Sequence, residues 1–223
     1  MLLIDFEWWK DANGYRLVEA EAAKPIILRA DGIEVTPTLM ERIGKPQRVV
    51  PNSGNRLSCR PLNKFAELYK AFASIETAES VLWFIKSYGP LTEAGLEPSR
   101  GEDVSYVLEH AESFRGWLDA NHRRRKELAT WIGEEGKKIG NLEASLTADD
   151  TGAMRLRVQP RTLLGALWVQ LAQTIAGGTM IRACLHCGGW FECGPGTDRR
   201  LDAKFCSDEH RVLFNSLKRS NGE

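Results

Sequence analysis

The sequence predicts an α+β fold, in which a helix-rich domain over residues 1–178 precedes a small module over residues 179–223. Polar and apolar residues alternate near the N-terminus, as they do in half-buried β-strands. After residue 61 the apolar residues recur with the spacing of helix faces instead. The module is set apart by its cysteines, because four of the five in the chain lie between positions 184 and 206.

The first 61 residues are predicted to form β-hairpins followed by an irregular connection. Residues 2–36 carry the alternation, and Asn13–Gly14 suits a type I′ hairpin turn. A second hairpin is expected around Asp31–Gly32. Residues 36–61 contain four prolines and a run of small polar residues, which indicates a long irregular connection.

Helical spacing begins with residues 65–72, where apolar side chains recur at i, i+3, i+4 and i+7. Thr77 is expected to cap a second helix that runs through Ile85 and ends at Gly89–Pro90. The longest helix follows Glu102–Asp103, whose carboxylates complement the positive end of the helix dipole. Its apolar stripe is made of Val104, Val107, Leu108, Ala111, Phe114 and Leu118.

Beyond this stripe the helical pattern is expected to continue as far as Ile132 before glycines weaken it. Met154–Val158 alternates like a short strand. A further helix is predicted after Pro160, and Gly177–Gly178 ends it and provides a hinge to the cysteine module. The buried face of this helix is predicted to consist of Leu164, Leu167, Trp168, Leu171 and Ile175.

Composition narrows the classes of function. Lys+Arg and Asp+Glu both number 30, so the net charge is zero and any contact with nucleic acid must come from a local patch. The N-terminus lacks the basic region of a signal peptide, and no apolar run reaches the roughly 18–20 residues that span a bilayer. We therefore expect a cytoplasmic protein without a membrane partner, in which clustered cysteines are metal ligands rather than disulfides.

The cysteine module has the spacing of a metal site. Cys184 and Cys187 form a CxxC pair, and Gly188–Gly189 can adopt the left-handed conformations of a knuckle that turns both thiolates toward one ion. Cys206 and His210 follow with i, i+4 spacing, which places both on one face of a helix. Four protein ligands complete the coordination of a tetrahedral zinc ion, so we predict a structural zinc site in a treble-clef-like finger.

Alternatives to this assignment remain open from the sequence. Cys193 could replace His210 as a ligand, and His186 is a further competitor that is expected to point away when the two CxxC thiolates converge. The cysteines could also be reduced thiols within a small apolar core. Zinc is favoured because a module of about 40 residues cannot bury enough core to fold alone.

The last helix and the loop before it carry the residues that could contact DNA. His210, Leu213, Phe214 and Leu217 share one helix face, which we expect to turn toward the metal and the preceding hairpin. The basic residues outside this face could contact phosphates and base edges, or could be a solvated surface. The candidates are Arg199, Arg200, Lys204, Arg211, Asn215, Lys218 and Arg219.

Patterns that indicate an enzyme are missing from the sequence. It contains no GxSxG, GxGxxG, GxxxxGK(S/T) or HExxH motif, and Asp149–Asp150 has no identifiable partner. His110 lies in an amphipathic helix, where we expect it to have a structural role. We therefore predict no catalytic residues and no enzymatic activity.

A wider pattern surrounds the four predicted ligands. It consists of Cys184-x-x-Cys187-Gly188-x-Trp190-Phe191, Arg199–Arg200, Phe205–Ser207 and His210–Arg211. Together with Ile4–Phe6 near the N-terminus, this pattern resembles the bacterial CGNR-type zinc fingers, which follow an ABATE domain in proposed stress-responsive transcription regulators. The resemblance implies DNA binding by the finger and ligand or stress sensing by the larger domain. Asp208–Arg211 stands where that family has Cys-Gly-Asn-Arg, so His210 would replace a cysteine ligand.

From these observations we predict a zinc-binding transcription regulator whose C-terminal finger contacts DNA. The alternative is a module that zinc folds for interaction with a protein partner, without nucleic-acid binding. Basic residues on one helix face favour the first hypothesis, whereas the zero net charge and Trp190, which we expect to be exposed, favour the second.

Overall fold

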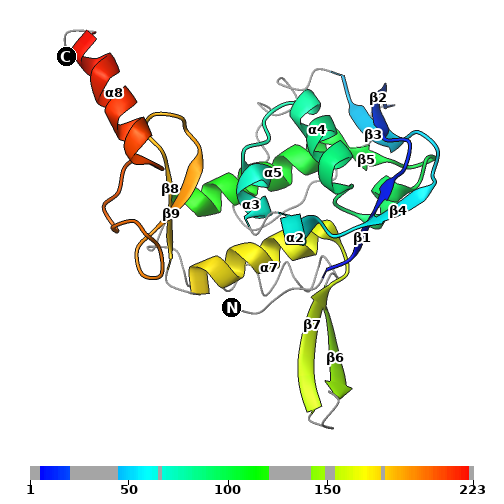
Figure 1. Cartoon of the computed structure of the whole chain (residues 1–223). Helices are drawn as coiled ribbons and strands as arrows, with labels where there is room; N and C mark the ends of the chain where they lie inside the picture. The colour runs from blue at the N-terminus through cyan, green and yellow to red at the C-terminus, as the bar shows by residue number, and fades with distance from the viewer. Residues whose placement is uncertain are drawn as a thin grey trace.

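The fold is α+β, as predicted, and its described parts are shown in Figure 1. The second predicted hairpin, the helical pattern through Ile132, Asp149–Asp150 and the Gly177–Gly178 hinge lie outside the described residues. The computed structural model describes residues 6–20, 45–64, 67–120, 142–148, 154–176 and 179–220.

The N-terminal strands belong to two small antiparallel sheets. Strand β1 (Trp8–Asp11) pairs with β4 (Arg56–Cys59). Strand β2 (Tyr15–Glu19) pairs with β3 (Gln47–Pro51), which also pairs with the short β5 (Glu102–Asp103). The predicted turn at Gly14 is present, with a φ of 77°, but the two strands that it joins pair with later strands and not with each other.

The side chain of Asp11 explains why β1 and β2 separate at this turn. Its carboxylate accepts hydrogen bonds from the backbone N–H groups of Asn13, Ser53 and Gly54. The Ser53 hydroxyl donates to the same carboxylate over 3.0 Å. Asp11 therefore fastens the turn after β1 to the loop between β3 and β4, and this bond network lowers the pKa of its carboxyl against the opposing effect of burial.

The prediction of an irregular connection over residues 36–61 is wrong where the structure describes it. Residues 47–51 and 56–59 are strands, and Val49 and Val50 are buried. Two of the four prolines in this stretch stand at strand margins, where a missing N–H breaks no ladder bond. Pro46 precedes β3 and Pro51 ends it.

The helical elements surround one apolar core. Thr77 and Ser80 form a reciprocal capping box at the start of α4 (Ala78–Tyr88), and Gly89, with a φ of 95°, ends this helix as predicted. The predicted apolar stripe lies on α5 (Val104–Ala120) and is buried along its full length. Within it, Phe114 contacts both Phe72 and the ring of Trp168. The helices of this region are α2 (Pro61–Lys64), α3 (Leu68–Ala73), α4 (Ala78–Tyr88), a 3-10 turn (Glu93–Leu96), α5 (Val104–Ala120) and α7 (Leu163–Ala176).

A hairpin of β6 (Leu142–Ala148) and β7 (Met154–Pro160) precedes α7 and extends away from the helices (Figure 1). The sequence predicts β7 within its observed bounds but gives no prediction of β6.

His110 is buried and packs edge-on against Tyr106, with ring centroids 4.5 Å apart. Burial lowers the pKa of its imidazole to about 4, which fits a neutral structural histidine.

Two further strands and the last helix form the C-terminal module. They are β8 (Met180–Ala183), β9 (Trp190–Cys193) and α8 (Asp208–Ser220). One face of the β8–β9 hairpin contributes Ile181 and the partly buried Trp190 to the large core. The other face contributes Phe191 and Cys193 to a second, smaller core. The expectation of an exposed Trp190 is therefore wrong, because its strand is docked on the larger domain.

A polar contact reinforces this docking. Lys70, on α3, has a side chain that is only 8% exposed, and its Nζ lies 3.1 Å from a carboxylate oxygen of Glu192 on β9. Glu67 forms a second ion pair with Lys70 at 2.8 Å. The hydroxyl of Tyr69 donates a hydrogen bond of 2.9 Å to Glu192. These contacts tie the β8–β9 hairpin to α3, a helix of the large core.

We expect Lys70→Met to lower the free energy of unfolding by about 1–3 kcal/mol, because it leaves Glu192 without its buried cationic partner. The estimate is reduced for the partial exposure of Glu192 and Glu67. Urea unfolding monitored by circular dichroism measures the change. Lys86→Met removes an exposed lysine from α4 and is the matched control, for which a change within about 0.5 kcal/mol is expected. Equal losses in both variants would contradict the structural role of the buried pair.

A second prediction concerns Glu102, which the sequence assigns to a helix start but which lies in β5. Its carboxylate is buried and accepts hydrogen bonds from the N–H and the hydroxyl of Thr92, at 3.0 Å and 2.9 Å. Burial raises the pKa of this carboxyl from 4.5 to about 7. Stability gained by the protonated form is therefore complete below pH 4.5 and is lost, by about 3 kcal/mol, as the pH rises to 7.

Glu102→Gln cannot titrate and should lack this pH dependence. Urea unfolding at pH 5 and pH 8 should show the wild type losing stability relative to the variant as the pH rises. A difference between the two proteins that stays constant over this range would contradict the raised pKa.

Candidate metal centre

The first two predicted ligands lie on a knuckle between β8 and β9. The N–H of Gly188 donates to the carbonyl of Cys184 over 2.9 Å, and the N–H of Cys184 donates to the carbonyl of Gly189 over 3.0 Å. Gly188 has a φ of 70°, a conformation that favours glycine. The predicted left-handed turn is confirmed at this residue, and it brings Cys187 back beside Cys184.

The second pair of ligands lies at the start of α8. The hydroxyl of Ser207 accepts a hydrogen bond of 3.1 Å from the N–H of His210, and the Ser207 carbonyl accepts one from the N–H of Arg211. Ser207 is therefore the predicted N-cap. Because Cys206 immediately precedes this cap, its side chain and that of His210 lie on the same side of the first turn.

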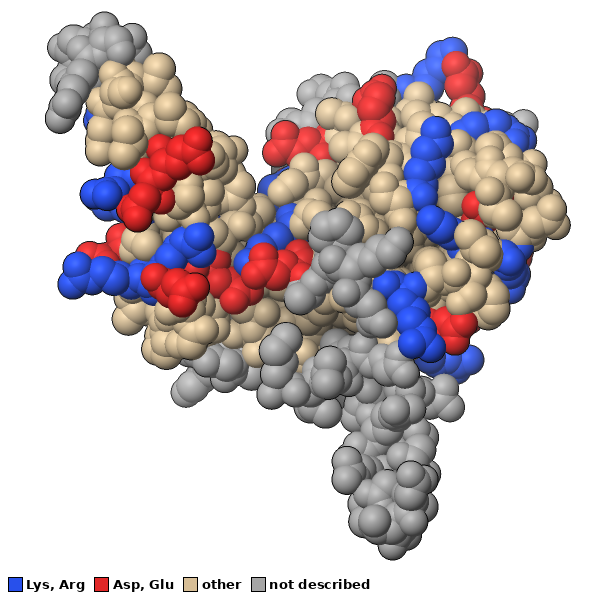
Figure 2. All heavy atoms as spheres, in the orientation of Figure 1, with Lys and Arg blue, Asp and Glu red and all other residues tan. Residues whose placement is uncertain are grey.

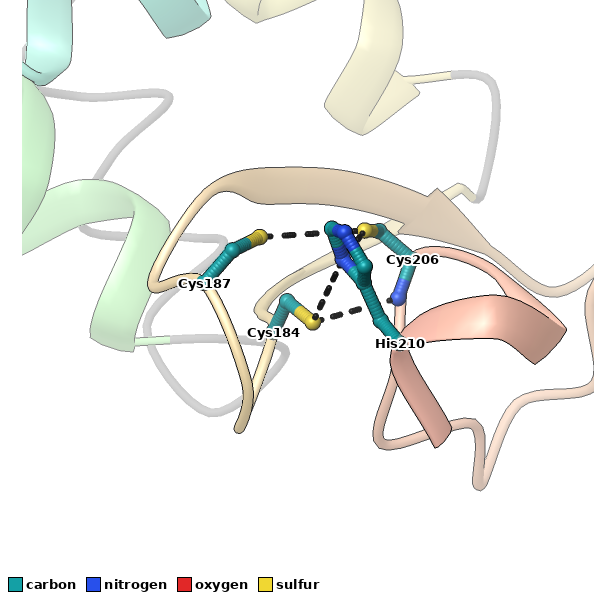
Figure 3. A group of neighbouring side chains, drawn as sticks. All are labelled: Cys184, Cys187, Cys206 and His210. Atoms are coloured by element: carbon teal, nitrogen blue, oxygen red, sulfur yellow. Dashed lines mark hydrogen bonds between the residues drawn. The ribbon is translucent and has the colours of Figure 1, made fainter. Parts of the chain in front are cut away.

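All four predicted ligands meet at one point (Figure 3). One ligand atom from each of Cys184, Cys187, Cys206 and His210 lies within 4.8 Å of the others. The sulfurs of Cys187 and Cys206 are 3.8 Å apart, and Nδ1 of His210 lies 3.8 Å from Cys184 Sγ and 2.9 Å from Cys206 Sγ. This arrangement of three thiols and one imidazole could hold a metal ion.

The surroundings shift the pKa values of Cys184 and Cys206 in opposite directions. Burial opposes ionisation of Cys184, but backbone N–H groups of Cys206, Cys187 and His186 and the ring of His210 outweigh it and lower the pKa of this thiol to about 6. Burial and the neighbouring thiols raise the pKa of Cys206 to about 11. Three thiolates in one place repel each other, and a bound cation removes that repulsion.

The geometry separates the competing ligands from the four. Cys193 is fully buried in the smaller core, and its thiol lies 3.7 Å from the carbonyl oxygen of Leu201. His186 lies with its ring centroid 4.9 Å from that of His210, but it is not part of the group of four ligand atoms. The structure therefore brings His210, and not Cys193, to Cys184, Cys187 and Cys206.

Several predicted DNA-contacting residues have partners within the module. The guanidinium of Arg199 donates to the carbonyl of Cys206 and lies over the ring of Phe191. Arg211 forms an ion pair of 3.1 Å with Asp208. Lys218 has its Nζ 5.7 Å from the centroid of the Phe214 ring. Arg200, Lys204 and Asn215 are exposed, and the side chain of Arg219 lies outside the described residues.

The expectation that the apolar face of α8 turns toward the metal and hairpin holds for His210 and Phe214 only. His210 joins the ligand group and Phe214 packs against Phe205, with ring centroids 5.3 Å apart. Leu213 and Leu217 are 43% and 56% exposed, which contradicts the prediction for these two. The reason is visible in Figure 1, where α8 leaves the module at one end and extends away from the rest of the chain.

The surface of the module carries charges of both signs. Acidic and basic side chains are interleaved over it on the face drawn in Figure 2, and neither sign forms a continuous area there.

No protein-family model matches the sequence, and no curated protein matches it either. Within the described residues, no helix is both long and apolar enough to cross a bilayer.

The ligand group makes a direct prediction about metal content. Purified without chelators, the wild-type chain should contain about one metal ion, and Cys206→Ser should contain little, because it removes one of four ligands. Cys193→Ala and Cys59→Ser alter thiols outside the group and should keep the metal. Elemental analysis gives both the amount and the identity of the metal. Loss of metal in Cys193→Ala and retention in Cys206→Ser would contradict the observed grouping.

Proposed function

We propose that Cys184, Cys187, Cys206 and His210 hold a structural zinc ion, and that residues 179–220 are a finger through which this chain, a transcription regulator, contacts DNA. The observation that carries this proposal is the position of α8. One end of the helix is fixed at a closed four-ligand site, and the rest extends into solvent (Figure 1).

The donor set supports zinc. Thiolate and imidazole are the ligands of tetrahedral zinc sites, and a Zn–S bond of about 2.3 Å places two ligand sulfurs about 3.8 Å apart. The sulfurs of Cys187 and Cys206 have this separation. Because protein atoms fill all four positions, the site leaves no place for a reacting water and is suited to a structural role.

The size of the module also supports a structural ion. The buried members of its own core are Cys184, Phe191 and Cys193, which is too few to fold a module of this length. Metal binding contributes on the order of 10 kcal/mol to folding in structural zinc modules. Zinc would therefore supply what the small core lacks and fix the angle at which α8 leaves it.

DNA contact is supported by the exposed polar side of α8. The major groove admits one α-helix, and exposed Asn and basic side chains can reach base edges and phosphates. Asn215 and Lys218 are exposed on the helix, and Arg200 and Lys204 are exposed in the loop before it. These four side chains come from adjacent parts of the module and are the residues to test first.

The combined variant Arg200→Ala, Lys204→Ala and Lys218→Ala should bind duplex DNA more weakly and with a lower salt dependence. Each lost phosphate contact reduces the slope of log K against log salt by about one. Fluorescence anisotropy with a labelled random-sequence duplex, at several salt concentrations, measures both quantities. Zinc content should remain that of the wild type, because none of the three residues is a ligand.

The control removes three exposed basic residues from the larger domain, by Arg56→Ala, Arg60→Ala and Lys86→Ala. It changes the net charge equally and should keep the wild-type affinity and slope. Equal weakening in both triple variants would reduce the effect to net charge and refute contact by the finger.

A second candidate function is docking of a protein partner on the same helix. The specific observation in its favour is that Val212, Leu213 and Leu217 are 62%, 43% and 56% exposed, whereas DNA contact requires none of them. Exposed apolar groups of this kind are typical of protein interfaces. A partner whose capture is lost in Leu213→Ser with Leu217→Ser, in a chain without salt-sensitive DNA binding, would select this function.

A further inference from the structure

The ligands of the metal centre differ in their access to solvent. Cys184 is only 3% exposed and belongs to the smaller core. Cys206 and His210 are half-buried, whereas Cys187 is exposed. Cys187 is therefore the ligand residue most open to a reagent dissolved in water.

The buried sulfur of Cys184 also has more hydrogen bonds than the sulfur of the exposed Cys187. Cys184 Sγ accepts the N–H of Cys206 over 3.4 Å, and two further backbone N–H groups are directed at it. Such bonds withdraw electron density and make a thiolate a weaker nucleophile. For Cys187 Sγ, the described hydrogen bonds consist of one contact, with the sulfur of Cys206 at 3.8 Å.

The residue that follows Cys187 on the knuckle is also open to solvent. Gly188 is exposed, and a Cβ placed on it would have no heavy atom within 4 Å outside residues 187–189. By contrast, the thiol of Cys193 is fully buried and lies against the carbonyl of Leu201. An exposed residue, a sulfur with one described hydrogen bond and a neighbouring thiol thus coincide at Cys187.

We propose that Cys187 is a site of oxidation by hydroperoxides, that Cys206 resolves it to a disulfide, and that this reaction releases the zinc ion. The inference rests on the zinc site proposed above. It adds to that site a reaction in which Cys187 is the attacking sulfur and Cys206 the resolving one.

The reaction balances in two steps. The Cys187 thiolate attacks one peroxide oxygen and the O–O bond breaks, which leaves a sulfenic acid on Cys187. The other oxygen leaves as hydroxide from hydrogen peroxide, or as alkoxide from an organic hydroperoxide, and is protonated to water or the alcohol. The Cys206 thiolate then attacks the sulfenic sulfur, forms the S–S bond and expels hydroxide, which becomes water. The two sulfurs lose two electrons to the peroxide, and zinc leaves as the divalent ion.

The consequence falls on α8. Cys206 stands directly before the Ser207 cap, and His210 stands in the first turn, so both ligands of this helix lose the ion together. Beyond the ligand group, the described packing of α8 on the module includes the contact between Phe214 and Phe205. The new disulfide keeps Cys206 joined to the knuckle, but the ion no longer holds His210 there. Oxidation therefore loosens α8 beyond Cys206, while the docking of β9 on α3 is left intact.

The test uses the full chain, shown by elemental analysis to hold about one zinc ion. Hydrogen peroxide is added and released zinc is followed with a chromogenic chelator, after which peptide mass spectrometry locates the disulfide. We expect about one zinc released per chain, a Cys187–Cys206 linkage, and recovery of zinc binding after reduction with dithiothreitol. A linkage that joins Cys184 to Cys187, or retention of zinc under peroxide, would overturn the proposal.

Cysteine variants test the same reaction without relying on mass spectrometry to locate the disulfide. Cys187→His keeps a zinc ligand but removes the attacking thiol, and should release zinc roughly tenfold more slowly or not at all. Cys206→His removes the resolving thiol, so its Cys187 should stop at the sulfenic acid or its over-oxidised forms. Cys59→Ser is the matched control and should behave like the wild type. Release from Cys187→His at the wild-type rate would refute the assignment, whereas a wild-type chain that binds no zinc would refute the proposed metal site itself.

Discussion

The β8–β9 hairpin is the element on which the organisation of this protein depends, because two cores share it. Alternation along the strands sends Ile181 and Trp190 to the large core and Phe191 and Cys193 to the small one. Cys184 and Cys187, two of the proposed metal ligands, lie on the turn that joins these strands. A change at the metal centre therefore acts on a hairpin that is also part of the domain core. Glu192 adds a polar tie, since it meets Lys70 and Tyr69 on α3.

This arrangement bears on how the proposed finger would work. A finger on a flexible tether searches for its target independently, whereas a docked hairpin keeps the knuckle at a fixed place on the larger domain. The ion then joins that fixed knuckle to the first turn of α8, through Cys206 and His210. The direction of α8 thus depends first on the docking of the β8–β9 hairpin on the domain core. It depends on the proposed ion only where the knuckle is joined to the start of the helix. Removal of the ion should loosen α8 before it loosens the domain.

The features that the sequence predicted correctly are those in which the signal and the structure are local. The CxxC pair and the i, i+4 pair each fold into the expected turn, because spacing alone determines that geometry. The Thr77 cap and the α5 stripe are equally local. Strand pairing is not local: Asp11 draws β1 away from β2 through bonds to residues about 40 positions later. Glu192 gives no signal in sequence either, since its partners on α3 lie more than 100 positions away.

The exposed apolar side chains of α8, Leu213 and Leu217, show the same contrast between local sequence signals and contacts that are distant in sequence. Amphipathic spacing reports that one face of a helix is apolar, but it does not report whether the chain supplies anything to cover that face. Here the module contacts His210 and Phe214, whereas Leu213 and Leu217 remain in solvent. A helix of 13 residues held at one end is marginally stable in water, even with a Ser207 cap and acidic residues in its first turn. Contact along its length would stabilise it, whether the polar side meets DNA or the apolar side meets a protein. The proposed ion would fix where the helix begins, and a bound partner would supply the order that the module cannot.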